Sequence, residues 1–341
     1  MSNQSKPNIS RRTFVRRSGA LAGGMLLGTE SWQAKAAAPT DAPAVSKPAA
    51  GEWPRRLLGR TKVPLTTMTL GTAPCGLSPK IPPPEIAKIV NHALDLGINS
   101  VDTAPAYIQA EEGVGMALGR RRKEIFLATK VLADTLEEAE KSLAKSLELL
   151  KTDCIDLVYY HSVGSHDVPK AMQSDGVFAW LLKQKAAGKF RFLGISGHHL
   201  PGAFSQLLET GEVDVLLTLV NFVDRHTYGF EETVLPIARK HDVGIVAMKV
   251  FGGASRKAGS YKNPKAPPEL PLEHLERAVG YALSTPGVAT VNLGVHNIDQ
   301  VTRNVEMVKR SGPLSAEEYA ETVALGVELA EQWGPHFGPV A

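Results

Sequence analysis

Four side chains whose types suit proton transfer occur in order along the chain, each at or just after the end of a short apolar segment. Asp102 ends Ser-Val-Asp, Tyr107 lies in the segment that follows, Lys130 ends Leu-Ala-Thr-Lys, and His161 follows Leu-Val-Tyr-Tyr. When a hydride reduces a carbonyl group, negative charge develops on the oxygen, which needs a proton donor and polar groups already in position. These four residue types at one site would meet both needs.

We expect Tyr107 to be the proton donor. A free phenol titrates near 10, and a cation within about 4 to 6 Å lowers such a pKa by about 1 to 3. Lys130 would supply that cation, Asp102 would keep it charged and oriented, and His161 would hydrogen-bond the substrate oxygen. Taken singly, the four could be a turn cap, loop packing, a paired lysine and a core histidine, but their occurrence at successive strand ends favours a shared catalytic site.

The elements that must hold these residues alternate between strands and amphipathic helices from Arg56 onward, which predicts a (β/α)8 barrel with its active site at the C-terminal ends of the strands. The expected strands are Leu65–Leu70, Ser100–Asp102, Ile125–Lys130, Cys154–Tyr160, Arg191–Ser196, Val213–Val220, Ile245–Lys249 and Val288–Leu293. The expected helices are Pro84–Leu96, Glu112–Leu118, Leu136–Leu149, Val177–Lys185, Pro201–Glu209, Glu231–Lys240, Leu272–Ser284 and Ile298–Lys309. A β-hairpin over Arg56–Val63 would precede the first strand, and an extra helix over Ser315–Gln332 would follow the last unit. A doubly wound open sheet is the alternative fold.

The ordered set of Asp102, Tyr107, Lys130 and His161 resembles the aldo-keto reductase superfamily, and the resemblance runs from about Arg56 to the C-terminus. Further matching stretches are Leu58-Gly59-Arg60-Thr61, Leu70-Gly71-Thr72, Leu193-Gly194-Ile195-Ser196, Val220-Asn221 and Asn304. The resemblance implies an oxidoreductase that interconverts a carbonyl and an alcohol with NADP, or alternatively NAD. The cofactor would lie across the barrel, because no Gly-x-Gly-x-x-Gly follows a strand here.

The resemblance also implies which residues contact the cofactor. Ser196 and Asn221 would hold the nicotinamide carboxamide, and Gly71 and Thr72 would lie beneath it. Gly197 and Met248 depart from the family pattern, which usually has Asn and a stacking aromatic there. Gly294 and Gln300 stand where relatives specific for NADPH often have Lys and Arg. The full expected set is Gly71, Thr72, Ser196, Gly197, Asn221, Met248, Lys249, Phe251, Gly252, Gly294, Gln300 and Asn304.

Two loops have sequences that suit contact with the phosphate groups of a cofactor. The segment Phe251–Pro271 carries several basic residues and would either fold over the cofactor's pyrophosphate or remain a solvated loop. Gly294–Asn297 leads into a helix N-terminus that suits phosphate.

The substrate pocket is expected to be lined by Ala106, Ile108, Trp180, His198, His199, Phe222 and Phe251, which would fit aldehydes, ketones or sugars. A metal at His198 and His199 is the alternative use of that pair, but no acidic ligand is near it, so no metal is expected.

The N-terminal residues resemble a twin-arginine (Tat) export signal. Ser10–Arg16 contains Arg11 and Arg12 with apolar residues close behind, and the apolar run 18–28 is far shorter than the roughly 20 residues that a membrane span needs. We expect a signal peptide over 1–38, a flexible linker over 39–54 and the barrel over 55–341, with export by the Tat machinery to the periplasm. An uncleaved amphipathic tail or membrane anchor is the alternative.

Charge and cysteine content limit the other function classes. The first 38 residues hold six of the 38 Lys and Arg and one of the 35 acids, so 32 basic residues face 34 acidic ones in the rest. This balance favours small molecules over nucleic acid as partners. Cys75 and Cys154 are too few for a disulfide framework and are predicted to be free thiols. Two other functions stay open: a non-catalytic dinucleotide-binding accessory or redox-sensing barrel, and an exported sugar-processing enzyme that retains its cofactor.

Overall fold

The computed structural model describes residues 53–253, 262–266 and 268–341. Contacts divide the chain into residues 1–36 and 37–341, and all the described residues belong to the second unit. The predicted signal over 1–38 and nearly all of the predicted linker over 39–54 lie outside the described residues. Within the described part, no helix is long and apolar enough to cross a membrane.

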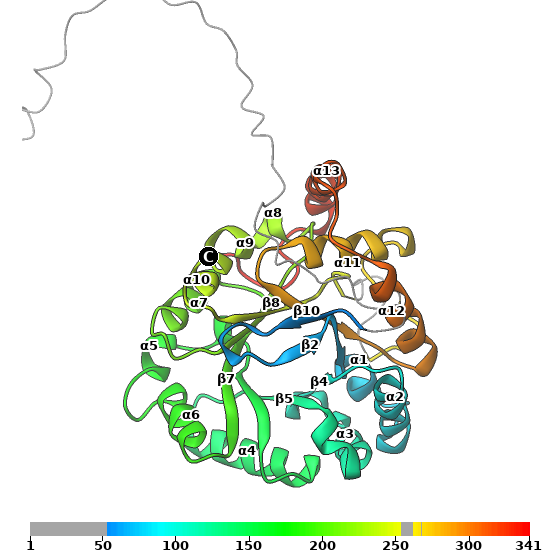
Figure 1. Cartoon of the computed structure of the whole chain (residues 1–341). Helices are drawn as coiled ribbons and strands as arrows, with labels where there is room; N and C mark the ends of the chain where they lie inside the picture. Colours follow the sequence, from blue (N-terminus) through cyan, green and yellow to red (C-terminus); the bar gives the residue numbers. More distant parts are fainter. Residues whose placement is uncertain (1–52, 254–261, 267) are drawn as a thin grey trace, which may run out of the picture. The chain divides into compact units, whose positions relative to one another are not determined.

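Eight parallel strands close into a barrel, as the alternating pattern predicted (Figure 1). Each strand pairs with its neighbours in chain order, and the last strand pairs with the first of the barrel. An open doubly wound sheet is therefore the wrong alternative. The strands are β3 (Met68–Gly71), β4 (Ser100–Asp102), β5 (Phe126–Val131), β6 (Ile155–Tyr160), β7 (Phe190–Ser196), β8 (Val215–Leu219), β9 (Gly244–Met248) and β10 (Val288–Gly294).

Helices surround the barrel and carry the apolar faces expected of them. The α-helices are α1 (Ala73–Leu77), α2 (Pro83–Asp95), α3 (Ala110–Leu118), α4 (Leu136–Leu150), α5 (Val168–Ala171), α6 (Val177–Ala186), α7 (Pro201–Leu208), α8 (Arg225–Tyr228), α9 (Phe230–Thr233), α10 (Leu235–Lys240), α11 (Leu275–Ser284), α12 (Ile298–Arg310) and α13 (Ala316–Trp333). The short 3-10 turns are η1 (Gly59–Thr61), η2 (Pro105–Tyr107), η3 (Gly119–Glu124), η4 (Val163–Ser165) and η5 (Leu272–His274).

Two predicted elements are divided in the structure. The expected helix 231–240 is split into α9 and α10, because Pro236 has no N–H to continue the helical hydrogen bonds of α9. The expected first strand 65–70 is split into β2 (Pro64–Thr66) and β3, since β2 pairs with a hairpin partner and β3 with the barrel. Short helices α1, α5 and α8 occupy loops in which the sequence pattern predicted no helix.

The hairpin precedes the barrel and closes one end of it. Strand β1 (Arg55–Leu57) pairs antiparallel with β2, and the hairpin, drawn blue, lies amid the ring of helices in Figure 1. Leu58 and Leu65 are almost fully buried and pack with the side chains that fill the barrel, such as Phe126, Leu157 and Val246. This apolar layer supports the polar residues at the opposite end of the strands.

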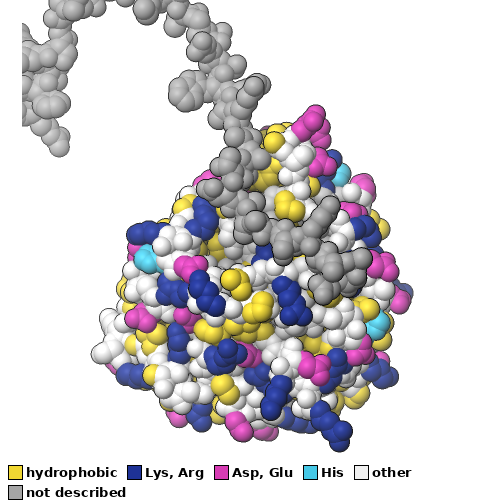
Figure 2. Space-filling view, in the orientation of Figure 1, with side chains coloured by type: hydrophobic (Ala, Val, Ile, Leu, Met, Phe, Trp, Pro, Cys, Tyr) yellow, Lys and Arg dark blue, Asp and Glu magenta, His cyan; other side chains and the backbone are white. Residues whose placement is uncertain are grey.

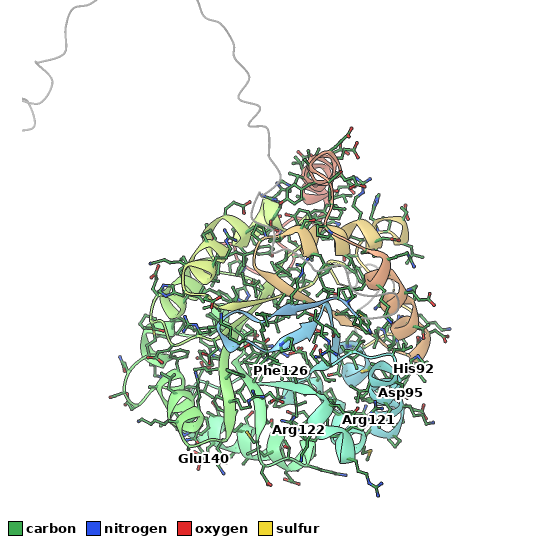
Figure 3. All side chains as sticks on the ribbon, in the orientation of Figure 1. His92, Asp95, Arg121, Arg122, Phe126 and Glu140 are labelled. Atoms are coloured by element: carbon green, nitrogen blue, oxygen red, sulfur yellow. The ribbon has the colours of Figure 1, made fainter. Side chains whose placement is uncertain are left out.

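Ion pairs link the turn η3 to an outer helix and to a barrel strand. Arg121 and Arg122 in η3, both labelled in Figure 3, reach different partners. Arg121 lies 2.6 Å from Asp95 at the end of α2, and Arg122 lies 2.8 Å from the buried Asp156 on β6. On the face shown in Figure 2, Lys and Arg side chains alternate with Asp and Glu rather than forming one broad basic patch.

The C-terminal helix α13 packs beside the loop that follows β8. A Cβ added at Gly326 would lie only 1.8 Å from the carbonyl oxygen of Phe222, so the two backbones are in close contact. Ser315 and Glu318 form a capping box at the start of this helix, which satisfies two backbone N–H groups. The predicted extra helix is confirmed, and it lies at the end of the barrel where the strands finish.

Candidate active site

The four residues expected to carry the chemistry lie together at the carboxyl ends of the strands. Asp102 is the last residue of β4, Lys130 lies one residue before the end of β5, and His161 follows β6 directly. Tyr107 ends η2, the short turn that leaves β4. The strand register explains why Asp102 and Lys130 lie close together. Asp102 pairs with Ala128 of β5, and Lys130 lies two residues further along β5 on the same face of the sheet.

Asp102 and Lys130 form a buried ion pair. Nζ of Lys130 lies 2.6 Å from Oδ1 of Asp102 and donates a second hydrogen bond of 2.8 Å to the carbonyl of Thr103. The two side chains are almost fully buried, at 1% exposed for Lys130 and 4% for Asp102. Burial lowers the pKa of Lys130, and the charge of Asp102 opposes that change. The pair thus holds an ammonium group at a fixed position in the barrel.

Tyr107 and His161 complete the group. Nζ of Lys130 lies 5.0 Å from the centre of the Tyr107 ring, and the rings of Tyr107 and His161 meet edge to face with centres 6.3 Å apart. Nδ1 of His161 is buried without a hydrogen-bond partner. Burial, aided by the charge of Lys130, holds the pKa of His161 well below its ordinary value. The imidazole is therefore neutral and suited to hydrogen-bond a neutral oxygen rather than to form an ion pair.

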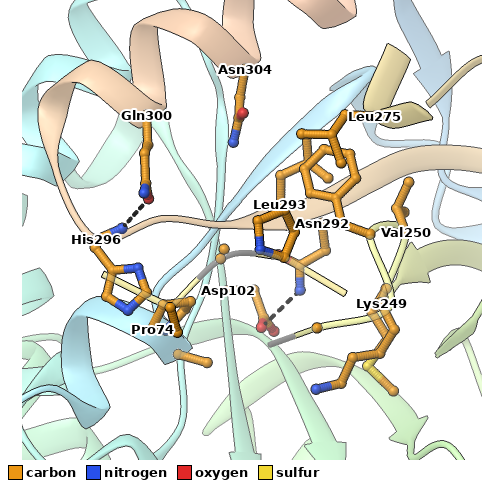
Figure 4. A pocket seen from close by; sticks show the side chains of 18 of the residues that line it. Pro74, Asp102, Lys249, Val250, Leu275, Asn292, Leu293, His296, Gln300 and Asn304 are labelled. Carbon is orange, nitrogen blue, oxygen red and sulfur yellow. Dashed lines mark hydrogen bonds between the residues drawn. The ribbon is translucent and has the colours of Figure 1, made fainter. Parts of the chain in front are cut away.

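A cavity of about 950 Å³ connects this group with much of the expected cofactor site (Figure 4). Asp102 and Tyr107 line it beside seven residues of the predicted cofactor set: Gly71, Met248, Lys249, Phe251, Gly294, Gln300 and Asn304. The remaining predicted residues, Thr72, Ser196, Gly197, Asn221 and Gly252, do not line it. The cavity thus joins a proton-transfer group to residues of the expected cofactor site, which is an arrangement that suits a dinucleotide and a small substrate.

Unpaired buried polar atoms test whether a dinucleotide fits. Oδ1 of Asn304 and Oδ1 of Asn292, both on residues that line the cavity, are buried without hydrogen-bond partners. Oγ of Ser196, at the end of β7, is also buried and unpaired. Native proteins rarely leave such atoms unsatisfied, so the two cavity positions, Asn292 and Asn304, suit a polar ligand. The residues present therefore fit a dinucleotide.

Asn221 has a different role from the one expected. Its Nδ2 donates to Asp224 and to the carbonyl of Lys249, and its Oδ1 accepts from the backbone N–H groups of Val223 and Asp224. These four bonds use every donor and acceptor of the amide. The geometry therefore does not support the expectation that Asn221 holds a carboxamide; the side chain instead fixes the turn after β8.

The other predicted residues outside the cavity have structural roles. Oγ1 of Thr72 donates to the carbonyl of Asp102 and so fastens the end of β4. Position 197 has no room for the Asn that the family pattern described above usually has there, because a Cβ on Gly197 would lie 2.8 Å from the ring of Phe204. Gly252, at φ +76°, lies directly under Trp333 of α13, where a Cβ would come within 2.3 Å.

Three polar residues of the cavity were absent from the predicted set of cofactor contacts. Nδ2 of Asn292 donates a 3.0 Å bond to the second oxygen of Asp102, and His296 and Arg303 also line the cavity. Asn292 is the only amide side chain in the mostly apolar strand β10, and it lies two residues before Gly294. This position could have identified it as a site residue from the sequence. Arg303 lies three residues after Gln300 and one before Asn304 in α12, so helical spacing could have found it too.

The residues expected to line the substrate pocket coincide only in part with this cavity. Of its seven predicted residues, Phe251 alone lines the cavity. Phe222 is fully buried and packs against Tyr281, with ring centres 6.0 Å apart. His198 lies beside His199 and Phe337 instead, near the C-terminal residues of the chain.

His161 and His198 are expected to make stability depend on pH. Burial and the nearby Lys249 lower the pKa of His198 to about 3, in the same direction as for His161. Below about pH 6.5 these histidines bind protons in the unfolded chain but not in the folded chain. Their contribution to the free energy of unfolding is therefore complete above that pH and is lost as the pH falls. We expect a loss of about 1 kcal/mol per pH unit for each histidine.

Urea unfolding between about pH 7.5 and about pH 5.5 measures this effect. The variant His198→Gln removes one titrating group, so its free energy of unfolding should fall less steeply with pH than that of the wild type. Equal slopes for the two proteins would show that His198 is not buried as described.

Residues 67–326 match the model of the Aldo/keto reductase family. L-galactose dehydrogenase of Arabidopsis thaliana is 27% identical over 299 residues, which cover 77% of this chain and 90% of that protein. The holo form of aldo-keto reductase AKR11C1 from Bacillus halodurans is 26% identical, with a TM-score of 0.65, and the match covers 81% of this chain and 97% of that one. An aldo/keto reductase from Klebsiella pneumoniae in complex with NADP and acetate shares the fold at 22% identity and a TM-score of 0.62, over 79% of this chain and 94% of that one.

Proposed function

Because the chain belongs to the aldo/keto reductase family and is an oxidoreductase of that family, we propose that it interconverts a small carbonyl compound and its alcohol with NADP, with Tyr107 exchanging the proton. The observation that carries this proposal is the cavity itself. It brings Tyr107 and Asp102, the partner of the buried Lys130, into one site with the unpaired amide oxygens of Asn292 and Asn304 and the guanidinium of Arg303. The substrate class is an aldehyde, a ketone or a sugar.

Bound NADPH would supply the hydride, and the chain's own residues manage the charge and the proton. Tyr107 donates its phenolic proton to the substrate oxygen as negative charge grows there. The Lys130 ammonium, 5.0 Å from the tyrosine ring, favours the phenolate that remains. His161, neutral at working pH, donates a hydrogen bond to the same oxygen and orients it. In the reverse direction Tyr107 accepts the proton of the alcohol.

The ion pair keeps this arrangement fixed. Asp102 holds Lys130 on one oxygen and receives Asn292 on the other, so the ammonium cannot turn away from Tyr107 without losing a 2.6 Å bond in a buried site. Preorganised charges of this kind need no rearrangement during the reaction, which is the main source of their catalytic effect.

Arg303 and His296 favour NADP over NAD. Arg303 of α12 lines the cavity, and Gln300 closes the loop before that helix by accepting a 2.7 Å bond from the backbone N–H of His296. A guanidinium offers a fork of donors that fits the oxygens of a phosphate group. The 2′-phosphate distinguishes NADP from NAD, and we propose that it lies against Arg303.

Replacement of Arg303 tests the cofactor assignment. We expect Arg303→Ala to weaken NADPH binding by about tenfold and to leave NADH binding unchanged, because only NADPH carries the phosphate. Titration of each cofactor, followed by the fluorescence of the reduced nicotinamide, measures both constants. Arg310→Ala is the matched control, since Arg310 lies on the same helix but pairs with Glu276 at 3.0 Å outside the cavity. Failure of the wild-type chain to bind either dinucleotide would contradict the proposed function.

The twin-arginine segment supports export as a further part of the proposal. We propose that residues 1–38 direct the folded barrel, residues 55–341, to the periplasm, with 39–54 as a linker. Replacing Arg11 and Arg12 together by Lys is expected to leave the uncleaved chain in the cytoplasm, because the pair is the feature that the export machinery reads. Cell fractionation with an antibody against the barrel measures the distribution. Unchanged export of the double variant would exclude the twin-arginine route.

A further inference from the structure

A second cleft lies at the opposite end of the barrel from Tyr107. It has a volume of about 890 Å³ and lies between the hairpin, the end of α10 and the amino ends of β9 and β10. Its lining residues are Arg55, Arg56, Leu57, Gly59, Arg239, Asp242, Val243, Gly287, Val288 and Ala289. Three of these residues are arginines, and only one is acidic.

Arg56 is the unusual member of this group. It is 7% exposed, and its Nη1 donates to the carbonyls of Leu283 and Val288 at 2.9 and 2.8 Å. Its Nε is buried without a partner. Among the residues that the structure describes, no carboxylate pairs with it, and burial lowers its pKa to about 10. A buried guanidinium held only by carbonyls has an uncompensated charge, which is costly unless an anion approaches it.

A second arginine reaches the same turn. Nη1 of Arg239 lies 3.4 Å from the carbonyl oxygen of Pro286. In the sequence, Pro286 lies between Leu283 and Val288, whose carbonyls bind Arg56. Gly287 leaves space for this side chain, because a Cβ there would lie 3.2 Å from Cγ of Arg239. The turn 283–288 therefore gathers two guanidinium groups, and the exposed Arg55 lines the same cleft.

The acidic residue of the cleft does not neutralise these charges. Asp242 forms an ion pair with Lys62 at 2.7 Å, and both side chains are more than half exposed. Three arginines thus face a carboxylate that already has a cationic partner. The cleft is positively charged, is partly enclosed and contains an unsatisfied buried donor.

We propose that this cleft binds a phosphate group, as the free ion or as a phosphate monoester of a small metabolite. Nη2 of Arg56, which takes no part in the bonds to Leu283 and Val288, and the guanidinium of Arg239 provide donors for the oxygens of a tetrahedral phosphate, and the dianion supplies the countercharge that Arg56 lacks. The site lies at the amino ends of the strands, so it is separate from the cavity that contains Tyr107 and does not depend on the proposed function.

Calorimetric titration of the chain with inorganic phosphate, at constant ionic strength, tests the proposal. We expect saturable binding that Arg239→Ala weakens by about tenfold, while Lys240→Ala, which removes the same charge one residue later, leaves it unchanged. Lys240 pairs with Glu209 and does not line the cleft. Arg56→Lys keeps the charge and removes the fork, so it should weaken binding too, with thermal unfolding as the check that it folds.

Two results would overturn the proposal. One is the absence of saturable binding of either phosphate or glycerol phosphate to the wild-type chain. The other is an equal loss of affinity in Arg239→Ala and Lys240→Ala, which would show a general charge effect. Tighter binding of glycerol phosphate than of phosphate would assign the cleft to a phosphate monoester, and equal binding would assign it to the free ion.

Discussion

Tyr107→Phe is expected to lower kcat for carbonyl reduction by about 10²–10⁴ and to leave the dissociation constant for NADPH nearly unchanged. The substitution removes only the hydroxyl group, so the ring keeps its contacts with Lys130 and His161. The substrate oxygen then has no proton donor when negative charge develops on it. Steady-state kinetics together with cofactor titration separates the loss of chemistry from a loss of binding.

Tyr159→Phe is the matched control for this prediction. Tyr159 also lies beside Lys130, with Nζ 5.6 Å from its ring centre, but it faces the barrel interior and does not line the cavity. Removing its hydroxyl should leave kcat within a few-fold of the wild-type value. If Tyr107→Phe retained as much activity as Tyr159→Phe, Tyr107 would not be the proton donor.

The second large effect concerns stability. Lys130→Met is expected to lower the free energy of unfolding by about 3–5 kcal/mol, because it leaves the carboxylate of Asp102 buried without a cation. The hydrogen bond from Asn292 would remain, but it carries no charge. Urea unfolding measures the loss, and activity should disappear along with the ion pair.

A double substitution identifies the origin of that loss. Asp102→Asn combined with Lys130→Met removes both charges, so the double variant should recover much of the stability that Lys130→Met loses. Such recovery is not expected if Lys130 stabilises the fold mainly by packing. A double variant that is less stable than either single variant would therefore contradict the ion-pair explanation.

The convergence of the four candidate catalytic residues at one end of the barrel could be predicted because it depends on local information. Each of Asp102, Lys130 and His161 stands at the end of an apolar run, and the rule that parallel strands end at one face brings them together whatever the details of packing. The barrel itself follows from alternating periodicities that each segment shows independently. The same reasoning placed the boundaries of β4 and α4 within a residue of those observed.

The residues that were missed or misassigned depend on contacts that no local pattern shows. Asn221 has the residue type that a carboxamide site needs, but its amide is used by the turn that follows it, and only the coordinates reveal those bonds. Arg303 reaches the cavity because β10 closes the barrel against β3 and so carries α12 to the same end. Arg56 looks like a surface residue in the sequence, yet the hairpin buries it against the turn after α11.

Transfer of deuterium from labelled NADPH to product tests the central claim most directly. The wild-type chain is mixed with NADPH deuterated at the reactive nicotinamide carbon and with a panel of small aldehydes, ketones and sugars, and the products are examined by mass spectrometry. We expect deuterium on the former carbonyl carbon of at least one product, and far less of that product when Tyr107→Phe is used for the same reaction time. Tight binding of NADPH with no transfer to any carbonyl would contradict the account and would favour a barrel that binds the dinucleotide without catalysis.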